Sequence, residues 1–298
     1  MSVHVSVLLK EVVDGLGLSP NQSALVVDGT FGGGGHSLEV LKNYPKSKIV
    51  ALDQDIGAWN RSKDKFEGVS NRITFRNLNF RDVGSLDIIS DAVMLDLGLS
   101  SDQLDNSGRG FTFKKDEPLL MTMLENPAES DLTAQDIVND WEESSLVAIL
   151  KGYGEEKFAT RISRGIIASR KDKRIETTFD LVRIIEASVP AFYRKGKIHP
   201  ATRTFQALRM AVNDEVNTLK LGLAGSWQIL KPKGRLAVIS FHSGEDRIVK
   251  NFFKEMVVEG QGILINKKPI TPTDQEVNLN KRARSAKLRI IEKTIKTK

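Results

Sequence analysis

Cysteine is absent from the 298-residue sequence. Its absence excludes a disulfide scaffold, a thiolate metal site, an iron–sulfur cluster and a cysteine nucleophile. No stretch of about 18 apolar residues is present, so no transmembrane helix is expected. Residues 1–10 also lack the cationic and apolar regions of a signal peptide. With 40% hydrophobic and 28% charged residues, the composition indicates a folded globular protein of the cytoplasm, without a membrane partner.

Acidic residues are scarce in the second half of the chain. Residues 1–100 carry 10 basic and 12 acidic side chains, and residues 101–160 carry 5 and 13. Residues 161–298 carry 29 basic and only 13 acidic side chains. Such an excess of positive charge favours a polyanionic partner, nucleic acid above all, over a surface that is merely solvated.

Short apolar runs alternate with helical patterns over the first hundred residues. Strands are expected at 23–28, 48–53, 72–80 and 91–96, with helices at 36–44 and 56–66 between them. Continuous apolar strands separated by helices predict a parallel sheet that is covered on both faces.

The strand pattern is missing between residues 103 and 199. Helical apolar spacing predicts helices there at 131–139, 142–150, 155–169 and 178–188. The α/β pattern then resumes with a long helical stretch at 201–230, a strand at 235–240, a helix at 246–258 and strands at 262–265 and 288–295. We therefore predict an α/β domain made of residues 1–103 and 200–298, interrupted by an inserted all-helical domain at 104–199.

Four consecutive glycines, 32–35, lie between the first expected strand and the following helix. Glycines at such a turn allow tight backbone geometry and close approach of a ligand. Asp53 ends the second strand about 20 residues after the loop, where a carboxylate can bind ribose hydroxyls. Asp28 and Asp96 end two further strands. This rim of acids favours a cationic S-adenosylmethionine over the pyrophosphate of a nicotinamide cofactor, although both remain open at this point.

Further motifs extend along nearly the whole chain and include the expected helical domain. They are His4–Glu11, Asp28–Ser37, Asp53–Asp55, Leu95–Asp105, Arg109–Phe113, Tyr153–Phe158, His199–Arg209, Ser240–Arg247 and Arg282–Ser285. In these segments the sequence resembles the bacterial ribosomal RNA cytosine-N4 methyltransferases, which modify a cytidine in the decoding centre of 16S rRNA. The resemblance implies a class I methyltransferase with a Rossmann-like sheet, S-adenosylmethionine as its cofactor, and 16S rRNA or the small ribosomal subunit as its partner. No metal-binding residue is predicted.

The resemblance also implies which residues contact the cofactor. The family's contacts fall on seven positions that this sequence retains: Gly34, Gly35, His36, Asp53, Phe80, Asp96 and Gln103. The sequence departs from the family between Asp116 and Met123, where Leu120 and Thr122 replace an acid and a base. A pocket that used that acid and base would be shaped differently here.

The chemistry of an amine substrate indicates further candidates. The N4 amine of cytosine is a weak nucleophile, and a hydrogen-bond acceptor such as Asp96 would take up its developing positive charge. Phe111, Phe113 and Phe241 are candidates to sandwich the base. His199 and His242 can contact the base or act locally, and Ser243 is expected to cap the following helix with Asp246 at its third position.

Phosphate contacts are expected from arginines and lysines of the basic half. The candidates are Arg203, Arg209, Arg170, Lys171, Lys173, Arg174, Lys281, Arg282, Arg284 and Lys287. A nicotinamide-dependent oxidoreductase and an RNA-binding ribosome assembly factor without catalysis remain the alternatives to a methyltransferase. The sequence is compatible with a homodimer and does not fix the oligomeric state.

Overall fold

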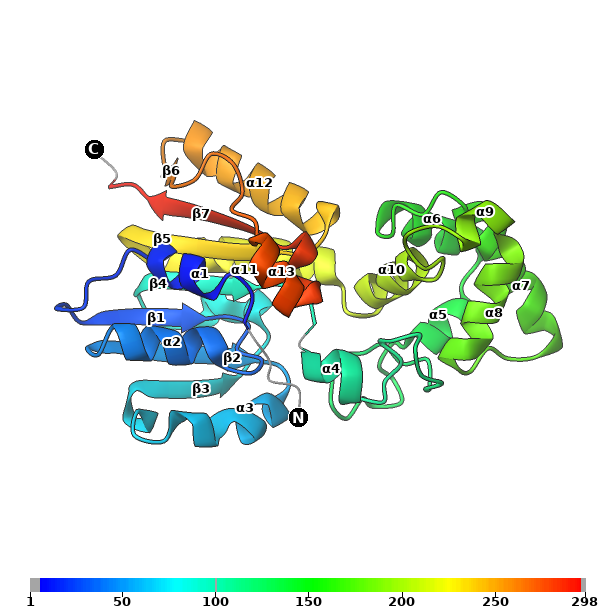
Figure 1. Ribbon diagram of the computed structural model, residues 1–298, viewed down its shortest axis with the longest axis horizontal. Helices are drawn as coiled ribbons and strands as arrows, with labels where there is room; N and C mark the ends of the chain where they lie inside the picture. The colour runs from blue at the N-terminus through cyan, green and yellow to red at the C-terminus, as the bar shows by residue number, and fades with distance from the viewer. Residues whose placement is uncertain (1–5, 100, 296–298) are drawn as a thin grey trace. The chain divides into compact units, whose positions relative to one another are not determined.

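The computed structural model describes residues 6–99 and 101–295, and the motif positions His4 and Ser100 lie outside these described residues (Figure 1). The chain divides into two compact units. Met1–Gly98 and Val216–Lys298 form what we call the α/β unit, and Leu99–Glu215 form the helical unit. No helix in the described ranges is long and apolar enough to cross a membrane.

A seven-stranded sheet forms the centre of the α/β unit, in the order β3-β2-β1-β4-β5-β7-β6. Strands β1 to β5 pair in parallel, whereas β7 runs antiparallel to both β5 and β6. The strands span Ala24–Asp28 (β1), Ser47–Asp53 (β2), Ile73–Asn77 (β3), Ser90–Asp96 (β4), Leu230–Ser240 (β5), Gly262–Leu264 (β6) and Lys287–Lys293 (β7). The prediction of a mostly parallel sheet with helices is confirmed.

Neighbouring residues of a strand enter different cores on the two faces of the sheet. Val26 of β1 packs in one core, while Val27 packs in the other. The first core includes residues of α1 and α2, and the second includes residues of α11 and α12. The helices and 3-10 turns of this unit span Leu9–Gly15 (α1), Gly35–Asn43 (α2), Ile56–Ser62 (α3), Glu215–Ile229 (α11), Ser243–Val258 (α12), Asp274–Leu279 (α13), Lys63–Phe66 (η1), Ser70–Arg72 (η2), Phe80–Ser85 (η3) and Lys281–Ser285 (η4).

The strand order reverses between β1 and β4, which are neighbours in the sheet although β2 and β3 separate them in sequence (Figure 1). Asp28 is the last residue of β1, and Asp96 is the last residue of β4. Open α/β sheets bind their ligands beyond the carboxyl ends of the strands at such a switch point. The fold therefore places these two carboxylates where a ligand is expected.

The helical unit has its own buried core, which includes Leu119, Ile137, Leu150, Ile162 and Leu181. Two of its helices begin with capping boxes, in which a threonine side chain and the acid three residues later bind each other's backbone N–H. Its helices span Ser101–Asn106 (α4), Ala134–Asp140 (α5), Glu143–Gly152 (α6), Ala159–Asp172 (α7), Thr178–Ser188 (α8), Ala191–Arg194 (α9) and Thr202–Val212 (α10).

The helical unit is longer at both ends than the predicted insert of residues 104–199. Helix α10, expected in the α/β domain, belongs to the helical unit because Phe205, Ala207 and Leu208 are buried in its core. The helical stretch expected at 201–230 is confirmed, but it consists of two helices, α10 and α11. Asp214 adopts a left-handed conformation with φ of 46°, which ends α10 before α11 begins.

Candidate functional site

The glycine loop connects β1 to α2 and is held by contacts within the α/β unit. Gly34 has a φ of 72°, and a Cβ atom there would lie 2.7 Å from Cζ of Phe31 and 2.8 Å from Cζ of Phe66. A Cβ atom on Gly35 would collide with Oγ of Ser6. The backbone conformation and the two rings therefore favour glycine at position 34, and a side chain at position 35 would require the Ser6 hydroxyl to move.

Asp53 fastens this loop to the end of β2. Its Oδ2 accepts a hydrogen bond from the backbone N–H of Gly32 at 2.8 Å, and its Oδ1 accepts one from Asp55 at 2.9 Å. Burial raises the pKa of Asp53, against the lowering effect of these two hydrogen bonds. Each carboxylate oxygen has two lone pairs, so Asp53 retains the capacity to bind a hydroxyl as well.

Asp28 is buried beneath the loop, with 3% of its surface exposed. Its Oδ2 accepts a 2.6 Å hydrogen bond from Oγ of Ser37, and its Oδ1 accepts one from the N–H of Thr30 at 3.2 Å. Desolvation nevertheless raises the pKa of Asp28 to about 6, with a smaller contribution from the negative charge of Asp53. The ionised form of this carboxyl is therefore costly until positive charge arrives nearby.

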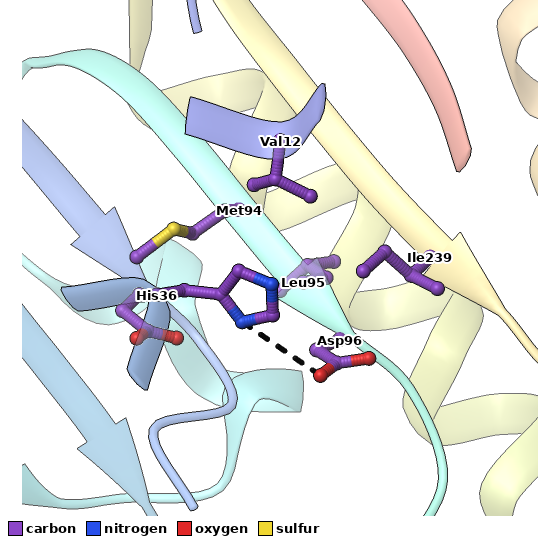
Figure 2. Close-up of a pocket in the computed structure, with 7 residues that line it drawn as sticks. Val12, His36, Met94, Leu95, Asp96 and Ile239 are labelled. Atoms are coloured by element: carbon purple, nitrogen blue, oxygen red, sulfur yellow. Dashed lines mark ion pairs between the residues drawn. The ribbon is translucent and has the colours of Figure 1, made fainter. Parts of the chain in front are cut away.

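Asp96 lies at the end of β4, and its carboxyl group faces the ring of His36 (Figure 2). Its backbone N–H donates to Oγ1 of Thr30 at 2.6 Å, which fixes the end of the strand. The side chain is 29% exposed as a whole, yet its Oδ1 atom is buried and has no hydrogen-bond partner among the described residues. Burial raises the pKa of Asp96 to about 8, and the negative charges of Asp28 and Glu245 act in the same direction.

Figure 2 shows the small pocket that is lined by the Asp96 carboxyl group and the His36 ring. Its polar wall is made by Asp28, His36 and Asp96. Its apolar wall is made by residues from α1, β4 and β5, namely Val12, Met94, Leu95 and Ile239. A pocket with acids on one side and apolar groups on the other suits a ligand that carries positive charge on a largely apolar body.

Phe80 and Gln103 are not among the residues that line this pocket, and their predicted contact with the cofactor stays a prediction. Phe80 does not end the third strand, because β3 stops at Asn77 and the side chain of Asn79 caps the η3 turn that Phe80 begins. Phe80 packs on the side of α11, where a Cβ atom on Gly222 would lie 2.5 Å from its Cε2. Gln103 belongs to α4 in the helical unit and is 8% exposed.

The aromatic candidates for the base sandwich have partners of their own. Phe111 is 7% exposed in the helical core, with the Arg109 guanidinium 5.5 Å above its ring. The Phe113 ring stacks on the His199 ring, with centroids 4.5 Å apart. In the α/β unit, Phe241 is partly buried against the core. The proposed role of these rings in binding a base stays a prediction.

His242, not Ser243, caps α12. Its Nδ1 accepts from the backbone N–H of Glu245 at 3.4 Å, while Oε2 of Glu245 accepts from the N–H of His242 at 3.3 Å. Asp246, the predicted partner of Ser243, instead binds Arg289 at 2.7 Å and Lys287 at 3.3 Å. A ring nitrogen thus replaces the expected hydroxyl as the helix cap, and the capping box begins one residue earlier than predicted.

Several cations predicted to bind RNA are engaged within the protein. Arg209 forms a bidentate ion pair with Glu215, with N–O distances of 2.6 and 2.8 Å. Arg203 donates to the carbonyl of Glu155 at 3.2 Å. Arg170 donates to two backbone carbonyls, and Arg174 lies near Asp136 and Asp140. Arg282 and Arg284 are exposed on η4, on either side of the buried Ala283.

Sequence reasoning missed the exposed segment 191–199 of the helical unit. Phe192 is 72% exposed and Ile198 is 50% exposed. Three cations, Arg194, Lys195 and Lys197, are exposed beside them, and the segment contains no acid. The sequence signal for this surface is a mixture of basic, aromatic and aliphatic residues without acids. A search for helical periodicity does not detect such a mixture.

Comparison with known proteins gives a consistent result over the whole chain. The sequence profile described as the MraW methylase family matches residues 1–294. The chain is 42% identical over 292 residues to the Ribosomal RNA small subunit methyltransferase H of Synechococcus elongatus, covering 98% of this chain and 95% of that protein. It is 44% identical over 312 residues to the protein of the same name from Clostridium botulinum, covering 97% and 98%.

Proposed function

The chain belongs to the MraW methylase family, and from this premise we propose that it transfers a methyl group from S-adenosylmethionine to the N4 amine of a cytidine in the decoding region of 16S rRNA. The relatives named above carry small-subunit ribosomal RNA methyltransferase in their names, which supports the class of substrate. The observation that carries the proposal is Asp96, a carboxylate at the switch point whose buried Oδ1 has no partner among the described residues.

The residues of the α/β unit fit the cofactor. Burial raises the pKa values of Asp28, Asp53 and Asp96, so a positively charged ligand beside them would stabilise their ionised forms. Asp53 has lone pairs for the ribose hydroxyls, and the pocket offers Met94 and Ile239 to an apolar body. When bound, S-adenosylmethionine supplies an electrophilic methyl group on a positively charged sulfur.

Asp96 is suited to activate the amine. A carboxylate that accepts a hydrogen bond from the N4 amine localises the nitrogen lone pair and stabilises the positive charge that develops on it. The raised pKa of Asp96, about 8, makes its carboxylate a stronger base than an ordinary aspartate. A bound cation favours the ionised form, so cofactor binding prepares this acceptor for the reaction.

Two exposed basic surfaces are suited to RNA. The η4 turn presents Arg282 and Arg284, and segment 191–199 presents Arg194, Lys195 and Lys197 beside the exposed ring of Phe192. Cations that follow a phosphate backbone, together with rings on which unpaired bases stack, are typical of single-stranded RNA binding. Ultraviolet crosslinking of the complex with small subunits should recover a peptide that contains Phe192.

The proposal also places the reaction in the cytoplasm, where small ribosomal subunits are assembled. A homodimer is compatible with it. Light scattering of the purified chain, at 33.1 kDa per copy, distinguishes a homodimer from a monomer.

The test is methyl transfer to small subunits taken from cells that lack this protein. We expect N4-methylcytidine at one position, detected by mass spectrometry of the digested RNA. Methylation of a ring carbon or ribose would contradict the amine substrate. Binding of NADH in place of S-adenosylhomocysteine would support an oxidoreductase. RNA binding and cofactor binding without any methyl transfer would support an assembly factor.

A further inference from the structure

The ring of His36 is held in one tautomer by the N-terminal segment. Its Nε2 lies 3.0 Å from the carbonyl oxygen of Val7. A carbonyl oxygen can only accept a hydrogen bond, so Nε2 carries the hydrogen. In the neutral ring the other nitrogen, Nδ1, is then the basic one. This Nδ1 points toward Oδ2 of Asp96, at 3.8 Å (Figure 2).

The residues on either side of Val7 make contacts that fix the position of its carbonyl group. Leu8 adopts a left-handed conformation with φ of 50°, and its N–H donates to Oε1 of Glu276 on α13 at 2.7 Å. Ser6 packs closely against Gly35, the residue before His36. His36 itself is 8% exposed. These surrounding contacts therefore hold the imidazole ring in one orientation, as expected for a side chain whose basic nitrogen must face a particular partner.

We propose that His36 receives through Asp96 the proton that leaves the amine, and thereby returns Asp96 to its carboxylate form for the next turnover. This inference rests on the function proposed above and adds a role for His36 beyond cofactor contact. The two facing atoms are 3.8 Å apart, and hydrogen bonds at reaction centres commonly shorten when the substrate complex forms.

Protons and electrons balance in this step. The bond from N4 to the methyl carbon forms, and the bond from that carbon to sulfur breaks with its electron pair left on sulfur. The surplus N4 proton passes to Oδ1 of Asp96. Rotation of the Asp96 carboxyl group, whose χ2 torsion is broad and nearly two-fold, presents this proton to Nδ1 of His36. The imidazolium then releases one proton to solvent.

The surroundings explain why Asp96 needs such an outlet. Asp28 on β1 and Glu245 on α12 are the other ionisable groups that act on it, and both are acids that favour its protonated form. Once the positive sulfonium has become a neutral thioether, these two acids and burial would keep the proton on Asp96. His36, on α2, is the basic group at the pocket wall that can remove it.

The first measurement is nitrogen NMR of the imidazole rings in the cofactor-free protein, with His36 assigned by His36→Gln. We expect the hydrogen on Nε2 of the neutral ring. We also expect the His36 signals to shift in a step near pH 8, the pKa to which burial raises Asp96, and this step should be absent from Asp96→Asn. A hydrogen on Nδ1, or a His36 titration that Asp96→Asn leaves unchanged, would overturn the inference.

The second measurement compares one turnover with many. Gln at position 36 can still donate to the Val7 carbonyl but has no basic nitrogen. In His36→Gln we expect the steady-state rate to fall by about tenfold or more, and by a larger factor than the rate of the first turnover. Calorimetry with S-adenosylhomocysteine checks cofactor affinity. Equal slowing of both phases would reject the role of His36, whereas a parent protein that transfers no methyl group would reject the proposed function itself.

Discussion

Buried ionisable groups are treated differently in the two units. In the α/β unit, Asp28 and Asp96 have pKa values raised to about 6 and about 8, and one oxygen of Asp96 is buried without a partner in the described ranges. In the helical unit, the buried Glu156 accepts hydrogen bonds from the Tyr193 hydroxyl and the Phe158 N–H, both at 2.8 Å. Glu156 thus stabilises the fold of the helical unit, whereas Asp96 keeps a buried oxygen without such a partner, which makes it a candidate for a functional role.

The pKa directions of Asp180 and Asp96 show the same contrast between these two carboxyl groups. Although desolvation alone would raise it, the pKa of Asp180 in the helical unit is lowered, because Arg183 and the backbone of Glu176 and Thr177 donate to it. Burial raises the pKa of Asp96, with no such donor to oppose it. A buried carboxyl group whose ionised form is stabilised by donors contributes to folding. One whose ionised form lacks such donors costs free energy, and is a candidate for a catalytic or binding role.

The largest effect is expected at the glycine loop. Gly34→Ala should lower the free energy of unfolding by about 3–5 kcal/mol, because the new Cβ meets Phe31 and Phe66 and a left-handed backbone adds strain. Gly68→Ala is the matched control, with φ of 84° and no atom within 4 Å of the methyl group that alanine would add. It should cost only about 1–2 kcal/mol. Urea unfolding measures both, and equal costs would show that packing around Gly34 can relax.

Asp96→Asn tests whether the carboxylate at the end of β4 takes part in the reaction. We expect single-turnover methylation to fall by at least about 10²-fold, because a neutral amide cannot take up the positive charge or the proton of the amine. Asp87→Asn, on an exposed position of the same unit, is the control for removal of one negative charge. If cofactor affinity and rate fall by the same factor, Asp96 only binds the cofactor.

The same variant should stabilise the fold. The pKa of Asp96 is raised from 3.8 to about 8, so the native state binds more protons than the unfolded state between these pH values. The contribution of Asp96 to the free energy of unfolding should therefore fall as pH rises from about 4 to 8. Asp96→Asn should avoid part of this loss, so the variant should be more stable than the parent by roughly 2 kcal/mol at pH 8. Urea unfolding at pH 5 and pH 8 measures the difference. A variant less stable than the parent at pH 8 would contradict the raised pKa.

A smaller effect is expected in the helical unit, at the ion pair of Arg209 and Glu215. Their side chains are 17% and 14% exposed. Arg209→Lys keeps the charge but loses the two-pronged geometry, so it should cost about 1–2 kcal/mol of stability. RNA affinity and its salt dependence should not change, since this guanidinium binds Glu215. A reduced salt slope in this variant would instead assign Arg209 to the RNA surface.

The sequence was sufficient for the sheet and for the acids at its edge. Strands such as Ser47–Asp53 are continuous apolar runs, and a carboxylate at the end of such a run is visible without a structure. The break at Asp214 was not visible, because helical spacing continues on both sides of a single left-handed residue. The partners of Arg209 and His242 were also hidden, since side-chain pairing depends on geometry that composition and spacing do not contain.

The smallest effect on the fold is expected at η4. Arg282 and Arg284 are exposed, whereas Ala283 between them is buried and holds the turn. Arg282→Ala with Arg284→Ala should leave cofactor affinity and melting temperature nearly unchanged. Binding to small subunits should weaken, and the slope of log K against log salt should fall by about 0.7–0.9 for each phosphate group that the variant no longer binds.

The control for η4 is Lys250→Ala with Lys254→Ala, which removes the same charge from exposed positions on α12. If binding depended only on the net charge of the chain, both pairs would weaken it equally, because long-range attraction is insensitive to where a cation lies. A contact surface at η4 requires the arginine pair to change the slope more than the lysine pair. Salt titrations of the two double variants beside the parent separate these cases, and equal slopes would move the RNA surface to segment 191–199, where Phe192 and its neighbouring cations are exposed on the helical unit.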